Sequence, residues 1–136
     1  MYIFFRPLGV LLLALLGGPA IFTAAAQDPA EDFTQARQHA DNGQLRKALA
    51  IYESLAANYP DNAEYLTELG RTQLSLKRAL AATWSLKDAI AADPQHEEAY
   101  RLLLQAYFES GQSERAYGIL QEARERFGDR PWMEDP

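Results

Sequence analysis

The feature that most constrains the fold of this chain is a repeat of 34 residues, which runs through most of its length. Ala48, Ala82 and Ala116 follow one another at this spacing, and Gly43 and Gly111 lie two periods apart. The other columns that keep the register are Pro60 with Pro94, Ala36 with Gly70 and Leu104, Tyr52 with Leu86 and Leu120, and Tyr59 with Phe127. One period shared by so many independent columns predicts stacked copies of a single supersecondary unit.

Each unit has the local pattern of two helices joined by a turn. Gly43 and Gly111 are placed to end a first helix, because glycine adopts the left-handed conformation at little cost. Pro60 and Pro94 are placed to stop the second helix, because proline lacks an N–H and clashes with the preceding turn. Residues suited to helix caps stand near these stops: Asp61, Asn62 and Asp93. No segment alternates with period two, so we predict an all-α fold with helices near 31–42, 45–58, 62–76, 79–92, 96–110 and 113–127.

The first 26 residues have the composition of a targeting segment rather than of the fold. Arg6 precedes an apolar run over residues 8–16, and a Gly-Gly-Pro break follows at 17–19. Ala24–Ala26 supplies the small residues that a signal peptidase accepts, so we expect cleavage before Gln27 and export of the remainder.

The competing interpretation is an uncleaved membrane anchor, with residues 8–26 as the tether. Arg6 and Asp28 bracket 21 uncharged residues, which is about the length that spans a bilayer. The break at 17–19 would interrupt that span, so we favour the cleaved signal peptide.

With these residues in view, the chain resembles the tetratricopeptide repeat family, whose 34-residue pattern has small residues, glycine and proline at fixed positions. The resemblance implies a right-handed superhelix of three repeats, a degenerate one at 29–62 and two more at 63–96 and 97–130, followed by a tail at 131–136. The matching positions are Ala36, Gly43, Ala48 and Pro60, then Gly70, Ala82, Ala89 and Pro94, then Gly111, Ala116 and Ala123. Small residues are needed here because two helices approach closely only where a small side chain faces the partner.

The chain departs from the family pattern in two places. Asp32, Gln35 and His39 occupy columns that are usually large and apolar, so the first helix is the least secure prediction. Lys77 replaces the turn glycine of the second repeat, and Gly128 replaces the last proline of the third.

The resemblance also implies a concave groove lined by the first helix of each repeat. Carried over by position, the partner-binding residues are Phe33, Arg37, Thr67, Arg71, Arg101, Gln105 and Phe108. The three arginines favour a protein or peptide partner of acidic character. The alternative is that they pair with acidic neighbours and only solvate this face, the candidates being Asp41, Glu64, Glu68 and Glu98. The residues that some family members use to grip a C-terminal carboxylate are not present.

Two further apolar features leave alternatives open. Trp132 and Met133 either fold back as a lid, which we favour, or leave the face around Tyr117 and Leu120 to another chain, including a second copy. Trp84 stands in a column that is usually polar, where it is either a binding hot spot or, as we favour, packed against a neighbouring helix.

Composition excludes several function classes. There is no cysteine, so disulfides and thiolate metal sites are absent, and a net charge of −6 disfavours nucleic-acid binding. His96-Glu97-Glu98 lacks the second histidine of a zinc-protease helix, since Tyr100 stands in that place. His39 is expected to be an inert, partly buried side chain. We find no catalytic, metal or cofactor motif and expect a non-catalytic scaffold in the bacterial periplasm, the wider envelope or outside the cell, with a tethered structural subunit as the alternative and an enzyme as a remote third.

Overall fold

The computed structural model describes residues 28–134, which form six α-helices, one short 3-10 helix and no strand. The elements are α1 (Pro29–Asp41), α2 (Leu45–Asn58), α3 (Ala63–Ser75), α4 (Ala79–Ala92), α5 (Glu97–Glu109), α6 (Ser113–Phe127) and η1 (Pro131–Met133). The predicted bounds of α2, α4 and α6 are confirmed to the residue, and those of α1, α3 and α5 are within two residues. The all-α prediction is therefore confirmed for the described part of the chain.

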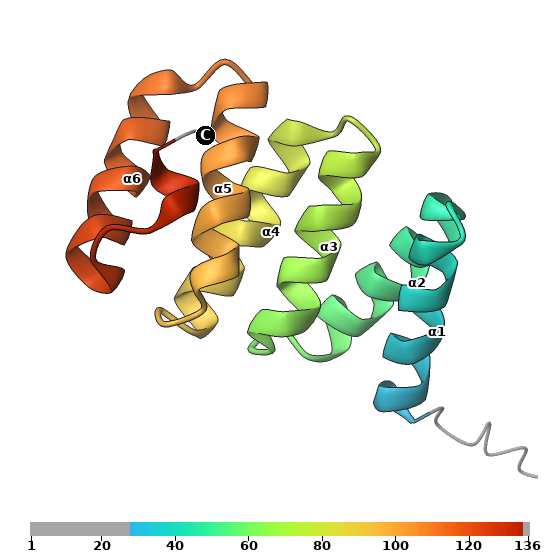
Figure 1. Ribbon diagram of the computed structural model, residues 1–136. Helices are drawn as coiled ribbons and strands as arrows, with labels where there is room; N and C mark the ends of the chain where they lie inside the picture. The colour runs from blue at the N-terminus through green and yellow to red at the C-terminus, as the bar shows by residue number, and fades with distance from the viewer. Residues whose placement is uncertain (1–27, 135–136) are drawn as a thin grey trace, which may run out of the picture.

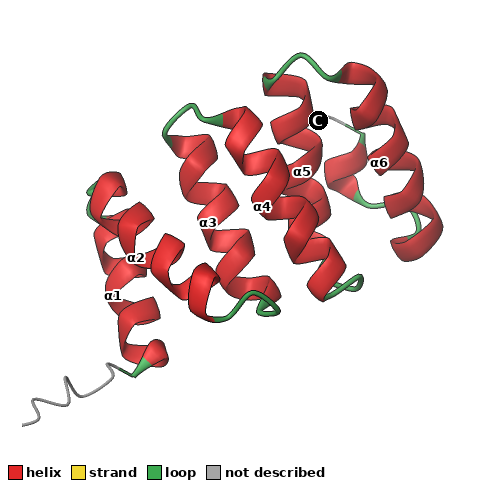
Figure 2. Ribbon diagram, turned by 180° about the vertical axis from the view of Figure 1, so that it is seen from behind, coloured by secondary structure: helices red, strands yellow, loops and turns green. Residues whose placement is uncertain are grey.

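The helices form three antiparallel hairpins that stack side by side in two layers. Figure 1 looks onto α1, α3 and α5, with α2 and α4 behind them. Figure 2 shows the opposite side, on which α2, α4 and α6 lie in front. We call these surfaces the first-helix face and the second-helix face.

Each hairpin turn contains one residue with left-handed backbone geometry. Gly43 has φ 72° and Gly111 has φ 74°, as predicted from their place in the repeat. Lys77 occupies the equivalent turn of the second hairpin with φ 61°, although a side chain makes this conformation costly. The turn geometry is thus kept where the glycine is lost.

The predicted helix caps are only partly confirmed. Asn62 caps α3, since its Oδ1 accepts a hydrogen bond of 3.1 Å from the N–H of Tyr65. Asp93 instead follows the end of α4, and its carboxylate accepts from the N–H of Gln95 within the loop. α5 begins after His96, which makes no side-chain cap.

Small residues lie where the helices approach most closely. Ala36, Ala48, Ala82 and Ala116 are fully buried. A Cβ added at Gly70 would stand 2.5 Å from Cγ of Leu86, so no larger residue fits there without movement. The remaining small repeat positions are also buried: Ala89 and Ala123.

The buried side chains form two main clusters and a smaller one near the C-terminal end. One cluster joins α1 and α2 to Leu69 of α3, and the larger one joins α3, α4, α5 and α6. The third consists of Tyr100, Ala123 and Met133, with Trp132 and Leu120 packed against it. Trp132 also donates a hydrogen bond of 2.9 Å from its Nε1 to Glu97. The predicted lid is therefore confirmed over Leu120, whereas Tyr117 stays 65% exposed.

Two other predictions are settled by the described residues. Trp84 is 63% exposed, so the favoured interpretation that it packs against a neighbouring helix is wrong. His39 is partly buried and its Nδ1 lies 2.6 Å from Oε1 of Gln44.

The signal segment at 1–26, with its alternative as a tether at 8–26, lies outside the described residues. Within 28–134, no helix has the length and apolar character needed to cross a bilayer.

Candidate interaction surface

The centre of the first-helix face is a group of ion pairs around Glu98. Oε1 of Glu98 accepts from Nη2 of Arg71 at 2.7 Å, and its Oε2 accepts from Nε of Arg101 at 2.7 Å. Arg71 also donates from its Nε to Glu68 at 3.2 Å. One carboxylate of α5 thus joins an arginine of its own helix to an arginine of α3.

These contacts favour the charged forms of Glu98, Arg71 and Arg101. The hydrogen bond from Arg101 lowers the pKa of Glu98, and the one from Arg71 adds to this against the effect of burial. Burial alone would lower the pKa of Arg71, but its bonds to Glu98 and Glu68 outweigh that effect and raise it. The pKa of Arg101 is raised by its bond to Glu98.

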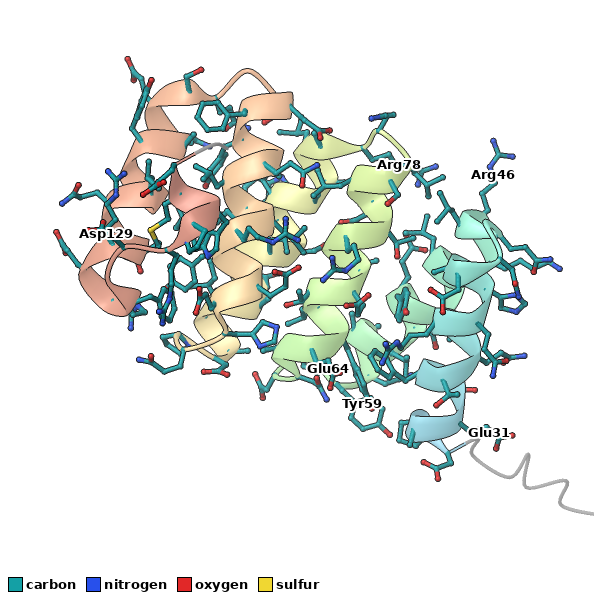
Figure 3. All side chains as sticks on the ribbon, in the orientation of Figure 1. Glu31, Arg46, Tyr59, Glu64, Arg78 and Asp129 are labelled. Carbon is teal, nitrogen blue, oxygen red and sulfur yellow. The ribbon has the colours of Figure 1, made fainter. Side chains whose placement is uncertain are left out.

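The predicted pairing of these arginines with acidic neighbours is therefore present for two of the three. Arg71 and Arg101 pair with Glu68 and Glu98, whereas Glu64, at the start of α3 in Figure 3, pairs with neither. Arg37 forms no ion pair with residues 28–134, and its guanidinium lies 6.0 Å from the ring centre of Phe33.

Pairing does not use up the donors of Arg71 and Arg101. A guanidinium carries five N–H groups, and each of these arginines donates within residues 28–134 from Nε and Nη2 only. Their side chains are 39% and 37% exposed. Nη1 of both arginines is therefore available to a second acceptor.

A cleft of about 430 Å³ opens beside this group, between α3 and α5. Its floor includes Leu74, which is buried. Its charged and polar lining is Arg71, Lys77, Arg101, Gln105 and Glu109. Nε2 of Gln105 donates to Glu109 at 2.8 Å, so the one acidic group in the lining already has a partner. Among residues 28–134 the cleft is thus lined by three basic groups and one acidic group, and two of the basic groups, Arg71 and Arg101, also pair with Glu68 and Glu98 beside it.

Sequence comparison then identifies the repeat. A family model described as tetratricopeptide repeat matches residues 77–132, and a second one with the same description matches residues 29–72. This chain belongs to the tetratricopeptide repeat (TPR) family. No curated protein sequence matches the TPR chain.

Solved TPR structures share its fold at low sequence identity. The Sgt2 TPR domain from Aspergillus fumigatus aligns at 18% identity with a TM-score of 0.71, over 78% of this chain and 72% of that one. The first TPR domain of Spaghetti (RPAP3), bound to the HSP90 peptide SRMEEVD, aligns at 17% identity with a TM-score of 0.74, over 80% and 86%. The Yersinia enterocolitica type III secretion chaperone SycD, in complex with a peptide of the translocator YopD, aligns at 14% identity with a TM-score of 0.69, over 78% and 81%.

The TPR groove positions carried over from the family do not all lie at one open surface. Arg71, Arg101 and Gln105 line the cleft together. Thr67 is buried at 2% exposure, where its hydroxyl donates to the carbonyl of Ala63, so it is not presented to a partner. The other two members of this column, Phe33 and Arg101, are only partly buried.

The two phenylalanines predicted beside the arginines have different environments. Phe33 is half-buried and packs against Tyr52 and Tyr65, with ring centres 5.8 and 5.1 Å apart. Phe108 packs edge-on against Tyr117 of α6 at 6.3 Å and does not line the cleft. Only Phe33 therefore lies next to a predicted groove arginine.

One residue that lines the cleft is not among the predicted contacts. Lys77 was noted only as a turn residue, yet it lies at the rim of the cleft because the turn follows α3 directly. Glu98, one of the four acidic neighbours considered in the sequence analysis, is the centre of the ion pairs, and it stands three residues before Arg101 on the same helix.

Proposed function

We propose that this TPR protein is a non-catalytic scaffold of the bacterial cell envelope that holds a protein or peptide segment on its first-helix face. The observation that carries the proposal is the cleft between α3 and α5, in which Arg71, Lys77 and Arg101 lie over an apolar floor. Guanidinium groups with unused donors favour carboxylates, because two parallel N–H donors match the geometry of a carboxylate. The partner segment is therefore acidic.

Peptide binding is in keeping with what similar TPR structures hold. The RPAP3 domain is bound to the peptide SRMEEVD, and SycD is in complex with a YopD peptide. Both share the fold of this chain at 17% identity or less. They therefore support peptide binding by this chain but do not indicate the sequence of the peptide.

The envelope location is proposed from the N-terminal sequence. A short basic start, an apolar core and Ala24–Ala26 support export with cleavage before Gln27. The alternative is a structural subunit of an envelope, secretion or pilus assembly complex, tethered through residues 8–26. N-terminal sequencing of the native protein separates these two, because Gln27 as first residue supports export and retention of Met1 supports the tether.

The cleft is tested by reversing its charge without breaking the ion pairs around Glu98. Lys77→Glu with Gln105→Glu changes the cleft by three charge units at two exposed side chains. We expect this double variant to lose capture of the partner from a solubilised envelope fraction, followed by mass spectrometry, while its thermal unfolding stays close to that of the parent.

A matched control places the same charge change elsewhere. Arg46 points away from the molecule at the start of α2 in Figure 3, and Gln95 is exposed in the loop before α5. Arg46→Glu with Gln95→Glu should retain capture. Equal loss in both double variants would show that net charge alone governs binding, and unaltered capture by the cleft variant would exclude this cleft as the docking surface.

A further inference from the structure

The second-helix face carries an exposed tryptophan that the fold does not use. Trp84 of α4 is 63% exposed, and its only aromatic or cationic neighbour within residues 28–134 is Lys87, whose Nζ lies 5.1 Å from the ring centre. Tryptophan is the residue type most enriched at binding hot spots, and an exposed one is costly to keep in water. Its surroundings therefore need a physical explanation.

Trp84 lies at the edge of a trough of about 550 Å³ between α4 and α6. α4 contributes Trp84, Lys87 and Ala91, and α6 contributes residues with the same spacing. Those on α6 are Arg115, Gly118 and Glu122. Residues at i, i+3 and i+7 lie on one side of a helix, so the trough follows both helices for about two turns. Its floor is apolar, formed by Leu103, Tyr107, Ile90 and Ile119.

Gly118 leaves the trough open at a cost to the helix. It lies in the interior of α6 with helical backbone geometry, where glycine is about 1 kcal/mol less favourable than alanine. A Cβ at this position would meet nothing within 4 Å, so no packing contact of the described chain requires a glycine. A glycine in such a place permits the close approach of another backbone.

The rim of the trough is positively charged. Lys87 and Arg115 form no ion pair within residues 28–134, whereas Glu122 accepts from the hydroxyl of Tyr100 at 3.0 Å and from Arg126 at 3.4 Å. The hollow on the other side of Trp84, toward α2, is flanked instead by Asp61 and Asp88. Charge thus distinguishes the two sides of the tryptophan.

From these observations we infer that the trough between α4 and α6 is a second docking surface, which takes an amphipathic helix of another protein with an apolar ridge flanked by acidic residues. The ridge packs against Trp84 and the apolar floor, the helix backbone approaches Gly118, and the acidic flanks face Lys87 and Arg115. A two-turn trough matches helix-in-groove recognition, which uses anchors at i, i+3 or i+4, and i+7. The inference does not depend on the cleft of the first-helix face, and the two surfaces together allow one chain to join two partners.

The test uses the full chain and two designed probes in fluorescence anisotropy. The first probe is a labelled helical 14-mer with leucines at i, i+3, i+4 and i+7 and glutamates beside them, and the second has lysines in place of the glutamates. We expect the glutamate probe to bind at least tenfold more tightly than the lysine probe. Trp84→Ala should weaken binding of the glutamate probe at least tenfold. Leu80→Ala is the control, because it removes an exposed apolar side chain outside the trough, and it should change the affinity less than twofold.

A second pair of variants separates loss of a contact from loss of the fold. Gly118→Ala should raise Tm and weaken binding of the glutamate probe, because its Cβ stands where the probe backbone approaches, and Gly118→Leu should raise Tm and abolish binding because its side chain fills the trough. Lys77→Glu with Gln105→Glu, which alters only the first-helix face, should leave probe binding unchanged.

Several results would overturn the inference. They are equal binding of both probes, equal losses for Trp84→Ala and Leu80→Ala, and probe binding to Gly118→Leu at parental affinity. A concentration-dependent dimer in sedimentation equilibrium that Trp84→Ala dissociates would assign the trough to a second copy. Binding to vesicles with 30% anionic lipid that Trp84→Ala abolishes would assign it to a membrane.

Discussion

The first hairpin and the two that follow it are built from the same repeat but are buried to different extents. α1 buries one residue, Ala36, whereas α3 buries eight and α5 buries seven. α3 and α5 are flanked on both sides by other elements, and no described element covers the outer side of α1 (Figure 1). The difference follows from position in the stack, because a helix of a solenoid is buried by its neighbours.

The sequence of α1 matches this position. Its columns at Asp32 and Gln35 are polar, and the equivalent columns of the third repeat are Tyr100 and Leu103, which are buried. A polar outer face is what a terminal repeat needs to stay in solution. The degenerate first repeat thus has the character of a cap, and we expect its local stability to be lower than that of α3–α6.

The largest expected effect is in the larger cluster. Leu86 is fully buried against α3, so Leu86→Ala leaves a cavity and should lower the free energy of unfolding by about 3 kcal/mol in urea titrations. Leu49→Ala makes the same change in the first hairpin, where it should cost about 2 kcal/mol. By hydrogen exchange, Leu49→Ala should speed exchange in α1 and α2 only. Faster exchange in α5 as well would show that the two regions unfold as one unit.

The next largest effect on stability is expected at the C-terminal lid. Met133 is 3% exposed and packs on Tyr100 and Ala123, so Met133→Ala should cost about 2 kcal/mol and loosen α6 before α1. Glu134→Ala, an exposed neighbour, should stay within about 0.5 kcal/mol of the parent. If Met133→Ala behaves like Glu134→Ala in differential scanning calorimetry, the lid adds nothing to stability.

Two buried tyrosines should respond to the same substitution with opposite signs. The hydroxyl of Tyr52, in the first hairpin, is buried and has no hydrogen-bond partner among residues 28–134, and burial raises its pKa to about 12. Tyr52→Phe removes this unsatisfied group and should stabilise the protein by about 1 kcal/mol. Tyr100→Phe loses a hydrogen bond of 3.0 Å to Glu122 and should cost about 1 kcal/mol in the same urea titration. Destabilisation by Tyr52→Phe would mean that its hydroxyl has a partner in solution.

The turns of the hairpins provide a smaller test. Lys77 has φ 61° where the first and third hairpins have glycine, so Lys77→Gly should raise the free energy of unfolding by about 0.5 kcal/mol. The gain is below the full cost of the left-handed conformation, because glycine also has more freedom in the unfolded chain. Gly111→Lys should lower stability by about 1 kcal/mol, since it adds the strain that Lys77 already carries. A gain from Gly111→Lys would exclude this explanation of the turns.

The backbone of this protein could be predicted more fully than its surface. The 34-residue spacing of the repeat predicts the position of every hairpin turn, including the one at Lys77. It does so because the register of the repeat and the length of the helices determine where the chain turns back. The closeness of Gly70 to Leu86 also agrees with the small residues that this column has in the first two repeats, Ala36 and Gly70. These features depend on the backbone, and the period of the sequence describes the backbone directly.

Side-chain pairing was less accessible to prediction. Glu98 was among four acidic candidates for pairing with the arginines, but which of the four pairs with Arg71, 27 positions away in the case of Glu98, depends on rotamers that no sequence pattern encodes. Thr67 falls in a groove column but is buried, and its hydroxyl donates to the carbonyl of Ala63 within α3. Trp84 stands in a column that is usually polar, which indicated exposure, but the packed alternative was favoured because tryptophan usually packs against a helix.

The smallest expected effect is on the pH dependence of stability, through the ion pairs that join neighbouring repeats. Glu98 joins α3 to α5 and its pKa is lowered below the usual 4.5, first by the bond from Arg101. A lowered pKa contributes stability at pH values above that of the unfolded carboxyl, and this contribution is lost as the pH falls through the folded pKa. Because Glu98 is 36% exposed, the loss should stay below about 1 kcal/mol. In Glu98→Gln, the free energy of unfolding should therefore fall less steeply between roughly pH 5 and 3 than in the parent. Arg37→Gln is the control, because Arg37 forms no ion pair within residues 28–134. This variant should keep the parental pH profile. If both variants give the parental profile, the ion pairs of the first-helix face do not stabilise the stack, and the junctions differ only in their apolar burial.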